Sequence, residues 1–192
     1  KIPSPIQLNT PSMKFVILTY KEAIPQAQET QAVLKKDWDI DADIIVGYKI
    51  GDTPTLTKYN VICHGFKDKI ADVYDEDIYY LEDDVRFTHN PLDIDLTKDI
   101  VWSVYRRGEI TNKPPHNVIT GTQAVYFSQK ALRELKKFME TRKFKQVDGY
   151  ISEFIIKHPH LSFEQPKKIG YEKIHHSLIS KPKDWMRYTR PN

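Results

Sequence analysis

The segment KFVILT, residues 14–19, is almost continuously apolar. An apolar run of this length is typical of a β-strand that is covered on both faces. Residues 22–36 follow with apolar side chains at helical spacing and with Pro25 near the start, where helices accept proline. Residues 43–47 then supply a second buried strand. This strand–helix–strand order predicts a parallel βαβ unit and therefore an α/β fold.

The rest of the chain extends this pattern. Apolar residues recur at intervals of three and four over residues 58–73, which predicts a helix. We predict further strands and helices in this order: strands 77–81, 99–105 and 122–128, then helices 129–142 and 147–157. Residues 1–12 resemble an extended lead-in, 106–117 a polar flap, and 158–192 a C-terminal segment that closes the site. The whole of 1–192 is expected to form a single domain with a mixed, mostly parallel sheet flanked by helices.

Composition excludes several classes of protein. A chain of 192 residues has the size of one domain, and 40% hydrophobic residues are enough to bury a core. The single cysteine, Cys63, excludes an internal disulfide and a Cys-rich metal site. A net charge of +3 argues against a nucleic-acid binder. With no apolar run near the roughly 18 residues of a membrane span and no signal-peptide pattern, we expect a cytoplasmic protein.

Three adjacent carboxylates form the most informative motif. Residues 79–85, YYLEDDV, place Glu82, Asp83 and Asp84 directly after an apolar strand. Neighbouring carboxylates repel one another and need a compensating charge. Divalent cations such as Mg²⁺ and Mn²⁺ take oxygen ligands, often completed by phosphate oxygens, and open α/β sheets bind ligands at the carboxyl ends of strands. The sequence therefore indicates a cation site here, with a solvated acidic turn as the alternative.

Residues 81–85, LEDDV, resemble the DXD-type metal motif of nucleotide-sugar glycosyltransferases with the GT-A fold. The form is similar to that of the lipopolysaccharide and collagen galactosyltransferase-like families. Further short segments resemble these families in the same order: 16–20, 58–60 with His64, 120–126, 147–150 and 169–177. The resemblance implies a Rossmann-like nucleotide-diphospho-sugar transferase fold.

The resemblance also implies a metal site. Asp84 would be the direct ligand, Glu82 would lie near the sugar nucleotide, and Asp83 could serve at either position. His175 and His176 are adjacent, and in an extended chain their side chains point to opposite sides, so only one would reach the metal. The resemblance favours His176, whereas two surface histidines are the alternative. Mixed oxygen and imidazole ligands would favour Mn²⁺, with Mg²⁺ as the other option.

Five further residues are candidates for donor binding and catalysis. Thr19 and Tyr20 follow the first strand and are candidates for contact with ribose and base, unless they serve only in strand-end packing. Lys58 is a candidate phosphate ligand. Asp148 is a candidate general base that takes the proton of the acceptor hydroxyl, and it would also suit the N-cap of the following helix. Glu153 is the second candidate base.

These features predict a metal-dependent glycosyltransferase that moves a hexose from a nucleoside diphosphate sugar, with UDP-hexose favoured, to a hydroxyl acceptor. A base at Asp148 favours inversion, and retention stays open. The acceptor could be a glycan, a glycoprotein, a lipid-linked sugar or a hydroxylated base in nucleic acid. One alternative is a nucleotidyltransferase, although residues 19–22, TYKE, lack its Gly- and Arg/Lys-rich loop. Another is a non-catalytic module that binds nucleic acid or glycan through the basic stretch 167–190.

Overall fold

The first strand, helix and second strand form the parallel βαβ unit that the sequence predicts. In the computed structural model, the described residues are 13–48, 65–102, 104–105, 123–141, 147–164 and 169–172. Strand β1 (Met13–Thr19) pairs in parallel with β2 (Ala42–Val46). The short 3₁₀ helix η1 (Lys21–Ala23) and helix α1 (Ile24–Trp38) connect them, and a proline occupies the first turn of α1.

The main sheet has six strands in the order β2-β1-β3-β7-β5-β8. Its remaining members are β3 (Asp77–Glu82), β5 (Ile100–Trp102), β7 (Ala124–Phe127) and β8 (Phe163–Glu164). Strands β2, β1 and β3 run parallel, and β5 and β8 are parallel to each other, whereas β7 runs antiparallel to both β3 and β5. The predicted α/β class with a mixed, mostly parallel sheet is confirmed.

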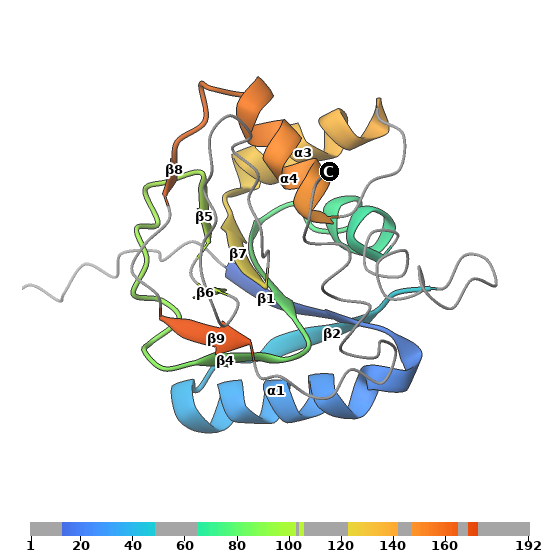
Figure 1. Cartoon of the computed structure of the whole chain (residues 1–192), viewed down its shortest axis with the longest axis vertical. Helices are drawn as coiled ribbons and strands as arrows, with labels where there is room; N and C mark the ends of the chain where they lie inside the picture. Colours follow the sequence, from blue (N-terminus) through green and yellow to red (C-terminus); the bar gives the residue numbers. More distant parts are fainter. Residues whose placement is uncertain are drawn as a thin grey trace, which may run out of the picture.

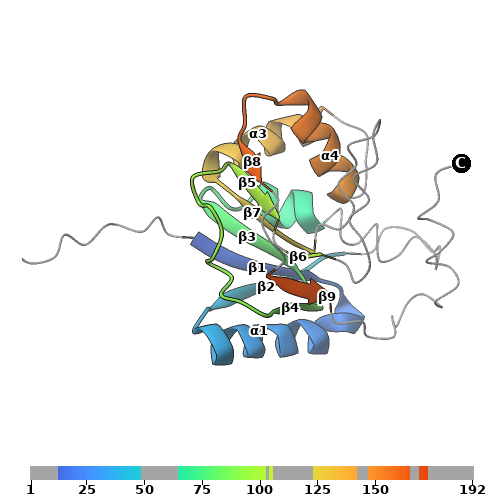
Figure 2. The same ribbon diagram turned by 60° about the vertical axis from the view of Figure 1, so that its left-hand side comes forward.

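A second, three-stranded sheet lies beside the main one, in the order β4-β9-β6. It contains β4 (Val85–Phe87), β6 (Val104–Tyr105) and β9 (Gly170–Glu172). The predicted single strand over 99–105 is wrong in this respect, because β5 and β6 belong to different sheets. Strands β4, β8 and β9 were not predicted, since each is only two or three residues long and shows no periodicity. Figure 2 shows β4 and β9 next to α1.

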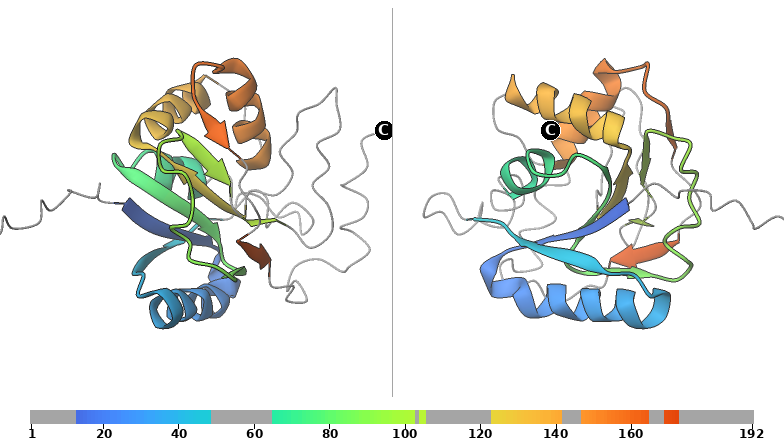
Figure 3. Two further views of the ribbon diagram at one scale, coloured as in Figure 1. Left: turned by 90° about the vertical axis from the view of Figure 1, so that its left-hand side faces the viewer. Right: turned by 180° about the vertical axis from the view of Figure 1, so that it is seen from behind.

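Helices cover both faces of the main sheet (Figures 1 and 3). Helix α1 lies on one face, and α3 (Gln129–Glu140), α4 (Val147–Lys157) and the π-helical turn η2 (Lys67–Ala71) lie on the other. The predicted helix at 147–157 is confirmed, and that at 129–142 is confirmed over 129–140, whereas residue 141 forms a turn and residue 142 lies outside the described residues. Of the helix predicted over 58–73, residues 65–71 are helical and residues 72–73 form a turn, and 58–64 lie outside the described residues.

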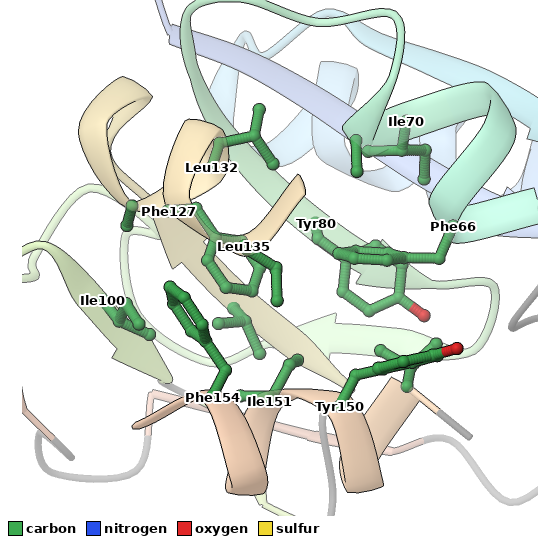
Figure 4. Close-up of a cluster of buried hydrophobic side chains, with 14 of the residues drawn as sticks. Phe66, Ile70, Tyr80, Ile100, Phe127, Leu132, Leu135, Tyr150, Ile151 and Phe154 are labelled. Atoms are coloured by element: carbon green, nitrogen blue, oxygen red, sulfur yellow. The ribbon is translucent and has the colours of Figure 1, made fainter. Parts of the chain in front are cut away.

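Alternation along the strands builds a separate core on each face. Phe15 and Ile17 of β1 pack in the core beneath α1, whereas Val16 and Leu18 pack in the core beneath α3 and α4. The second core is rich in aromatic side chains, and Figure 4 shows Phe66, Tyr80 and Phe154 within it. Both faces of β1 are thus buried, which explains its continuous apolar sequence.

Several predictions lie outside the described residues, namely the lead-in 1–12, the flap 106–117, and residues 165–168 and 173–192 of the C-terminal segment. The single-domain organisation stays a prediction. Within the described ranges, no helix combines the length and the apolar character needed to cross a bilayer.

Asp99 joins three elements on the α3 side of the sheet. Its carboxylate accepts hydrogen bonds from the Ser162 backbone N–H (3.0 Å), the Ser128 hydroxyl (3.1 Å) and the Lys130 ammonium (3.2 Å). Burial alone would raise the pKa of Asp99, but these donors outweigh it and hold the pKa below its ordinary value of 3.8. A lowered carboxylate pKa stabilises the fold above the pKa of the unfolded chain and ceases to do so as the pH falls through the folded value.

We expect Asp99→Asn to lower the free energy of unfolding by about 1–3 kcal/mol at pH 7, because an amide N–H₂ group would face donors that now have an acceptor. Urea denaturation at pH 7 and at decreasing pH measures this. The difference from the wild type should shrink below pH 3.8, the ordinary pKa of Asp99. A difference in unfolding free energy between variant and wild type that stays constant down to the acid transition would contradict the lowered pKa of Asp99.

Candidate functional site

The acidic triplet lies at the carboxyl end of β3 and turns directly into β4. Glu82 is the last residue of β3, Asp83 and Asp84 form a two-residue turn, and β4 begins at Val85. Glu82 pairs with Leu18, so the turn also lies beside the end of β1. Its backbone N–H donates to the Gln123 carbonyl (2.8 Å) of the neighbouring strand segment. The triplet therefore occupies the sheet edge where α/β folds bind ligands.

The turn is buried, which a simple solvated acidic turn would not be. Asp83 and Asp84 are only 3% and 5% exposed, and Glu82 is half-buried. Removing a carboxylate from water is costly unless hydrogen bonds or opposite charges compensate. The hydrogen-bond partners of each acid therefore determine whether its carboxylate can bind a ligand.

Asp83 is held from two other elements. The Thr19 hydroxyl, at the end of β1, donates to Oδ2 of Asp83 (2.7 Å), and the Gln26 amide of α1 donates to Oδ1 (2.9 Å). The Thr30 hydroxyl, one turn further along α1, donates to the Asp83 backbone carbonyl (2.5 Å). Both carboxylate oxygens and the carbonyl of this turn residue thus contact α1 or β1.

Arg86 extends these contacts from the β4 side. Its guanidinium donates to the Thr30 hydroxyl and to the Val85 carbonyl (2.7 Å), and it forms an ion pair with Glu29 (3.1 Å). The Arg86 side chain is 8% exposed, whereas that of Glu29 is 45% exposed. We call the set of Thr19, Gln26, Glu29, Thr30, Asp83 and Arg86 the anchor network.

The structure brings some of the predicted site residues together and leaves others undescribed. Thr19 is fully buried and Tyr20 is 6% exposed at the end of β1, next to the acidic turn. Lys58 and His176 lie outside the described residues. Asp148 lies in the first turn of α4, but its side chain is not among those described, and Glu153 of α4 forms an ion pair with Lys157 (2.9 Å). The roles predicted for all of these residues stay predictions.

The donor chemistry of the turn fits a hard divalent cation. Among the residues that the structure describes, no group of three His, Cys, Asp or Glu side chains is arranged to hold a metal ion. Cations that act on nucleotides commonly take one or two protein carboxylates and complete their coordination with phosphates and water. Asp84, with Glu82 two residues before it, supplies carboxylate oxygens of this kind.

Sequence reasoning missed Gln26, Thr30 and Arg86. Gln26 and Thr30 are four residues apart, so they lie on the same face of α1. Polar residues on the buried side of an otherwise apolar stripe were the available signal. Arg86 follows the triplet within two residues, and a cation so close to three acids could have been read as their counter-charge.

The sequence matches no protein-family model and no curated protein. Solved structures do resemble it. A mutant β-1,4-galactosyltransferase 7 from Drosophila, in complex with manganese, UDP-Gal and xylobiose, aligns with a TM-score of 0.50 at 9% identity, over 93% of this chain and 80% of that one. A protein from Bacillus anthracis, named as a glucose-1-phosphate thymidylyltransferase and bound to sucrose, aligns with a TM-score of 0.57 at 12% identity, over 94% and 97%.

These likenesses concern the fold. The chain has the α/β fold that GT-A glycosyltransferases and sugar nucleotidyltransferases share, with the acidic turn at the carboxyl end of its third strand.

The ion pair between Arg86 and Glu29 predicts an asymmetric response to the removal of its two charges. Arg86→Met should lower the free energy of unfolding by about 2–4 kcal/mol, because it removes buried donors to Thr30 and to the Val85 carbonyl. Glu29→Gln should cost less than about 1 kcal/mol, since Glu29 is half in solvent. Chemical denaturation of both variants measures the two values. Equal costs, or a larger cost for Glu29→Gln, would contradict the burial pattern.

Proposed function

We propose that this protein is a metal-dependent glycosyltransferase that moves a hexose from a nucleoside diphosphate sugar, with UDP-hexose as donor, to a hydroxyl acceptor. The observation that supports this most is the LEDDV turn, buried and anchored at the carboxyl end of β3 in a GT-A-type fold. The Drosophila enzyme with a similar fold was solved with manganese and UDP-Gal, which is consistent with the proposal.

Donor binding is assigned to the residues around this turn. Asp84 and His176 would hold Mn²⁺ or Mg²⁺, and Glu82, Tyr20 and Lys58 would contact the sugar nucleotide. Thr19, which was also predicted to contact the donor, is fully buried and its hydroxyl donates to Asp83. The bound cation would supply Lewis-acid neutralisation of the diphosphate leaving group. Thr19 is the last residue of β1 and Tyr20 follows it, and Glu82 pairs with Leu18. These three residues therefore lie at the same edge of the sheet.

Acceptor activation is assigned to Asp148. Helix α4 begins at Val147, so Asp148 lies inside its first turn and not at the N-cap, and the predicted capping role is wrong. As general base, Asp148 would take the proton of the acceptor hydroxyl while the donor sugar is attacked from the side opposite the diphosphate. This arrangement would give inversion. The acceptor would be a glycan, a glycoprotein or another hydroxyl compound, and a cytoplasmic location remains part of the proposal.

A sugar nucleotidyltransferase is the second candidate, because the Bacillus anthracis structure shares the fold with a TM-score of 0.57. Such an enzyme binds a nucleoside triphosphate and would be expected to offer glycine backbone N–H groups to its phosphates. Here the chain passes from the end of β1 through Tyr20 into η1 (Lys21–Ala23), and residues 19–26 contain no glycine. The sequence after β1 therefore favours transfer of a sugar.

Slow hydrolysis of UDP-hexose in the presence of Mn²⁺ distinguishes the candidates. The wild type should release UDP, and Asp84→Asn should lower this rate by about 100-fold or more, because the carboxylate that holds the cation is lost. Asp93→Asn, at an exposed aspartate of the β4–β5 connection, is the matched control and should leave the rate unchanged. Release of pyrophosphate from a nucleoside triphosphate and a sugar 1-phosphate would instead establish the nucleotidyltransferase.

Asp148→Asn tests the base. Transfer to an acceptor should fall by about 10²- to 10⁴-fold, the usual contribution of a general base. The affinity for UDP with Mn²⁺, measured by calorimetry, should stay at the wild-type value, because Asp148 is assigned to the acceptor. Transfer at the wild-type rate would remove Asp148 from the mechanism, and Glu153→Gln would then be the next variant to measure.

A further inference from the structure

We propose that Asp83 is a positioning residue rather than a metal ligand, and that α1 acts through it to fix the acidic turn so that Asp84 can hold the cation. This inference rests on the proposed function, since it concerns the same cation site. It reassigns Asp83, for which the sequence left both a donor-binding and a metal-binding role open, and it adds Gln26 and Thr30 of α1 to the residues on which the site depends.

The hydrogen bonds of Asp83 point to this role. Its two carboxylate oxygens accept from Thr19 (2.7 Å) and Gln26 (2.9 Å), which are neutral donors from two different elements. The carboxylate is therefore directed toward β1 and α1, and only 3% of the residue is exposed. Each oxygen already accepts one hydrogen bond at near-ideal distance, so a cation would have to reach a remaining lone pair of a carboxylate that is buried against β1 and α1.

Strand periodicity leads to the same assignment. Tyr79 and Leu81 of β3 and Val85 of β4 pack in the core beneath α1, and Asp83 falls in the same odd-numbered phase. Its hydrogen bond to Gln26 of α1 agrees with that phase. Glu82, the last residue of β3, takes the opposite phase, whereas Asp84 lies in the turn between β3 and β4.

A second set of contacts fixes the backbone of the turn. The Thr30 hydroxyl donates to the Asp83 carbonyl (2.5 Å), and Arg86 donates both to Thr30 and to the carbonyl of Val85. The backbone on either side of Asp84 is thus held to α1, directly through Asp83 and through Arg86. A ligand whose backbone is fixed on both sides meets the cation in one orientation.

The test measures binding of Mn²⁺ in the presence of UDP, by the electron paramagnetic resonance signal of free Mn²⁺. Gln26→Met keeps a long side chain but removes the donor to Asp83, and it should weaken Mn²⁺ binding by about 10-fold, as loss of an outer-shell partner typically does. Gln28→Met, at an exposed position of the same helix, is the matched control and should bind as the wild type does.

Thr30 supplies an independent pair of variants. Thr30→Val removes the hydroxyl and should also weaken Mn²⁺ binding by about 10-fold, whereas Thr30→Ser keeps the hydroxyl and should restore it. If one of the two α1 variants fails to fold, the other still tests the proposal. Melting temperatures of all variants show whether the protein is folded at the temperature of the titration.

A double-mutant cycle separates positioning from general destabilisation. In an Asp84→Asn background the residual Mn²⁺ affinity should not change further when Gln26→Met is added, because the residue that Gln26 positions is already lost. Equal factors in both backgrounds would overturn the inference. Wild-type affinity in both Gln26→Met and Thr30→Val would also overturn it, as would Asp83→Asn removing Mn²⁺ binding as completely as Asp84→Asn does.

Failure of the inference is distinguishable from failure of the proposed function. If Mn²⁺ binds to the wild type in the presence of UDP, and Asp84→Asn weakens this binding but the α1 variants do not, the inference alone is overturned. A wild type that binds no Mn²⁺ with UDP overturns the proposed function and, with it, the inference.

Discussion

The hydrogen bonds between the Asp83 carboxylate and the side chains of Thr19 and Gln26 are the contact on which the site depends. They join the end of β1, the first half of α1 and the turn that leaves β3. Without them a buried carboxylate would lie at the sheet edge with its desolvation uncompensated. With them the acidic turn is held as a fixed part of the fold, and Asp84 follows a residue that cannot swing into solvent.

The two cores make this contact possible. Because β1 and β3 bury side chains on both faces, the strands are fixed between α1 on one side and α3 and α4 on the other. Both strands run parallel and end at the same edge of the sheet, so Thr19 at the end of β1 lies beside the acidic turn at the end of β3. Helix α1 then covers the odd-numbered residues of β3 and reaches the turn with Gln26 and Thr30.

The larger elements could be predicted from sequence, and the anchor network could not. The continuous apolar run of β1 was visible because both of its faces are buried. The strand after α1 was also found, but β2 is an edge strand whose Asp43 is exposed and whose other residues are mostly half-buried, so its prediction as a buried strand is wrong in that respect. Strands β4, β8 and β9 are too short for any period to appear. The acidic triplet was identified as a site, but its burial and the direction of Asp83 depend on Thr19, Gln26 and Arg86, which only the folded chain brings together. Four predicted site side chains, those of Lys58, Asp148, His176 and the alternative His175, lie outside what the structure describes.

Crystals of the protein grown with Mn²⁺ and UDP, and measured at the manganese absorption edge, give the most direct test of Asp84 as the metal ligand. We expect an anomalous peak at the Asp84 carboxylate, with Asp83 still hydrogen-bonded to Thr19 and Gln26. A peak at the Asp83 carboxylate, or manganese and UDP bound away from the β3–β4 turn, would contradict this assignment.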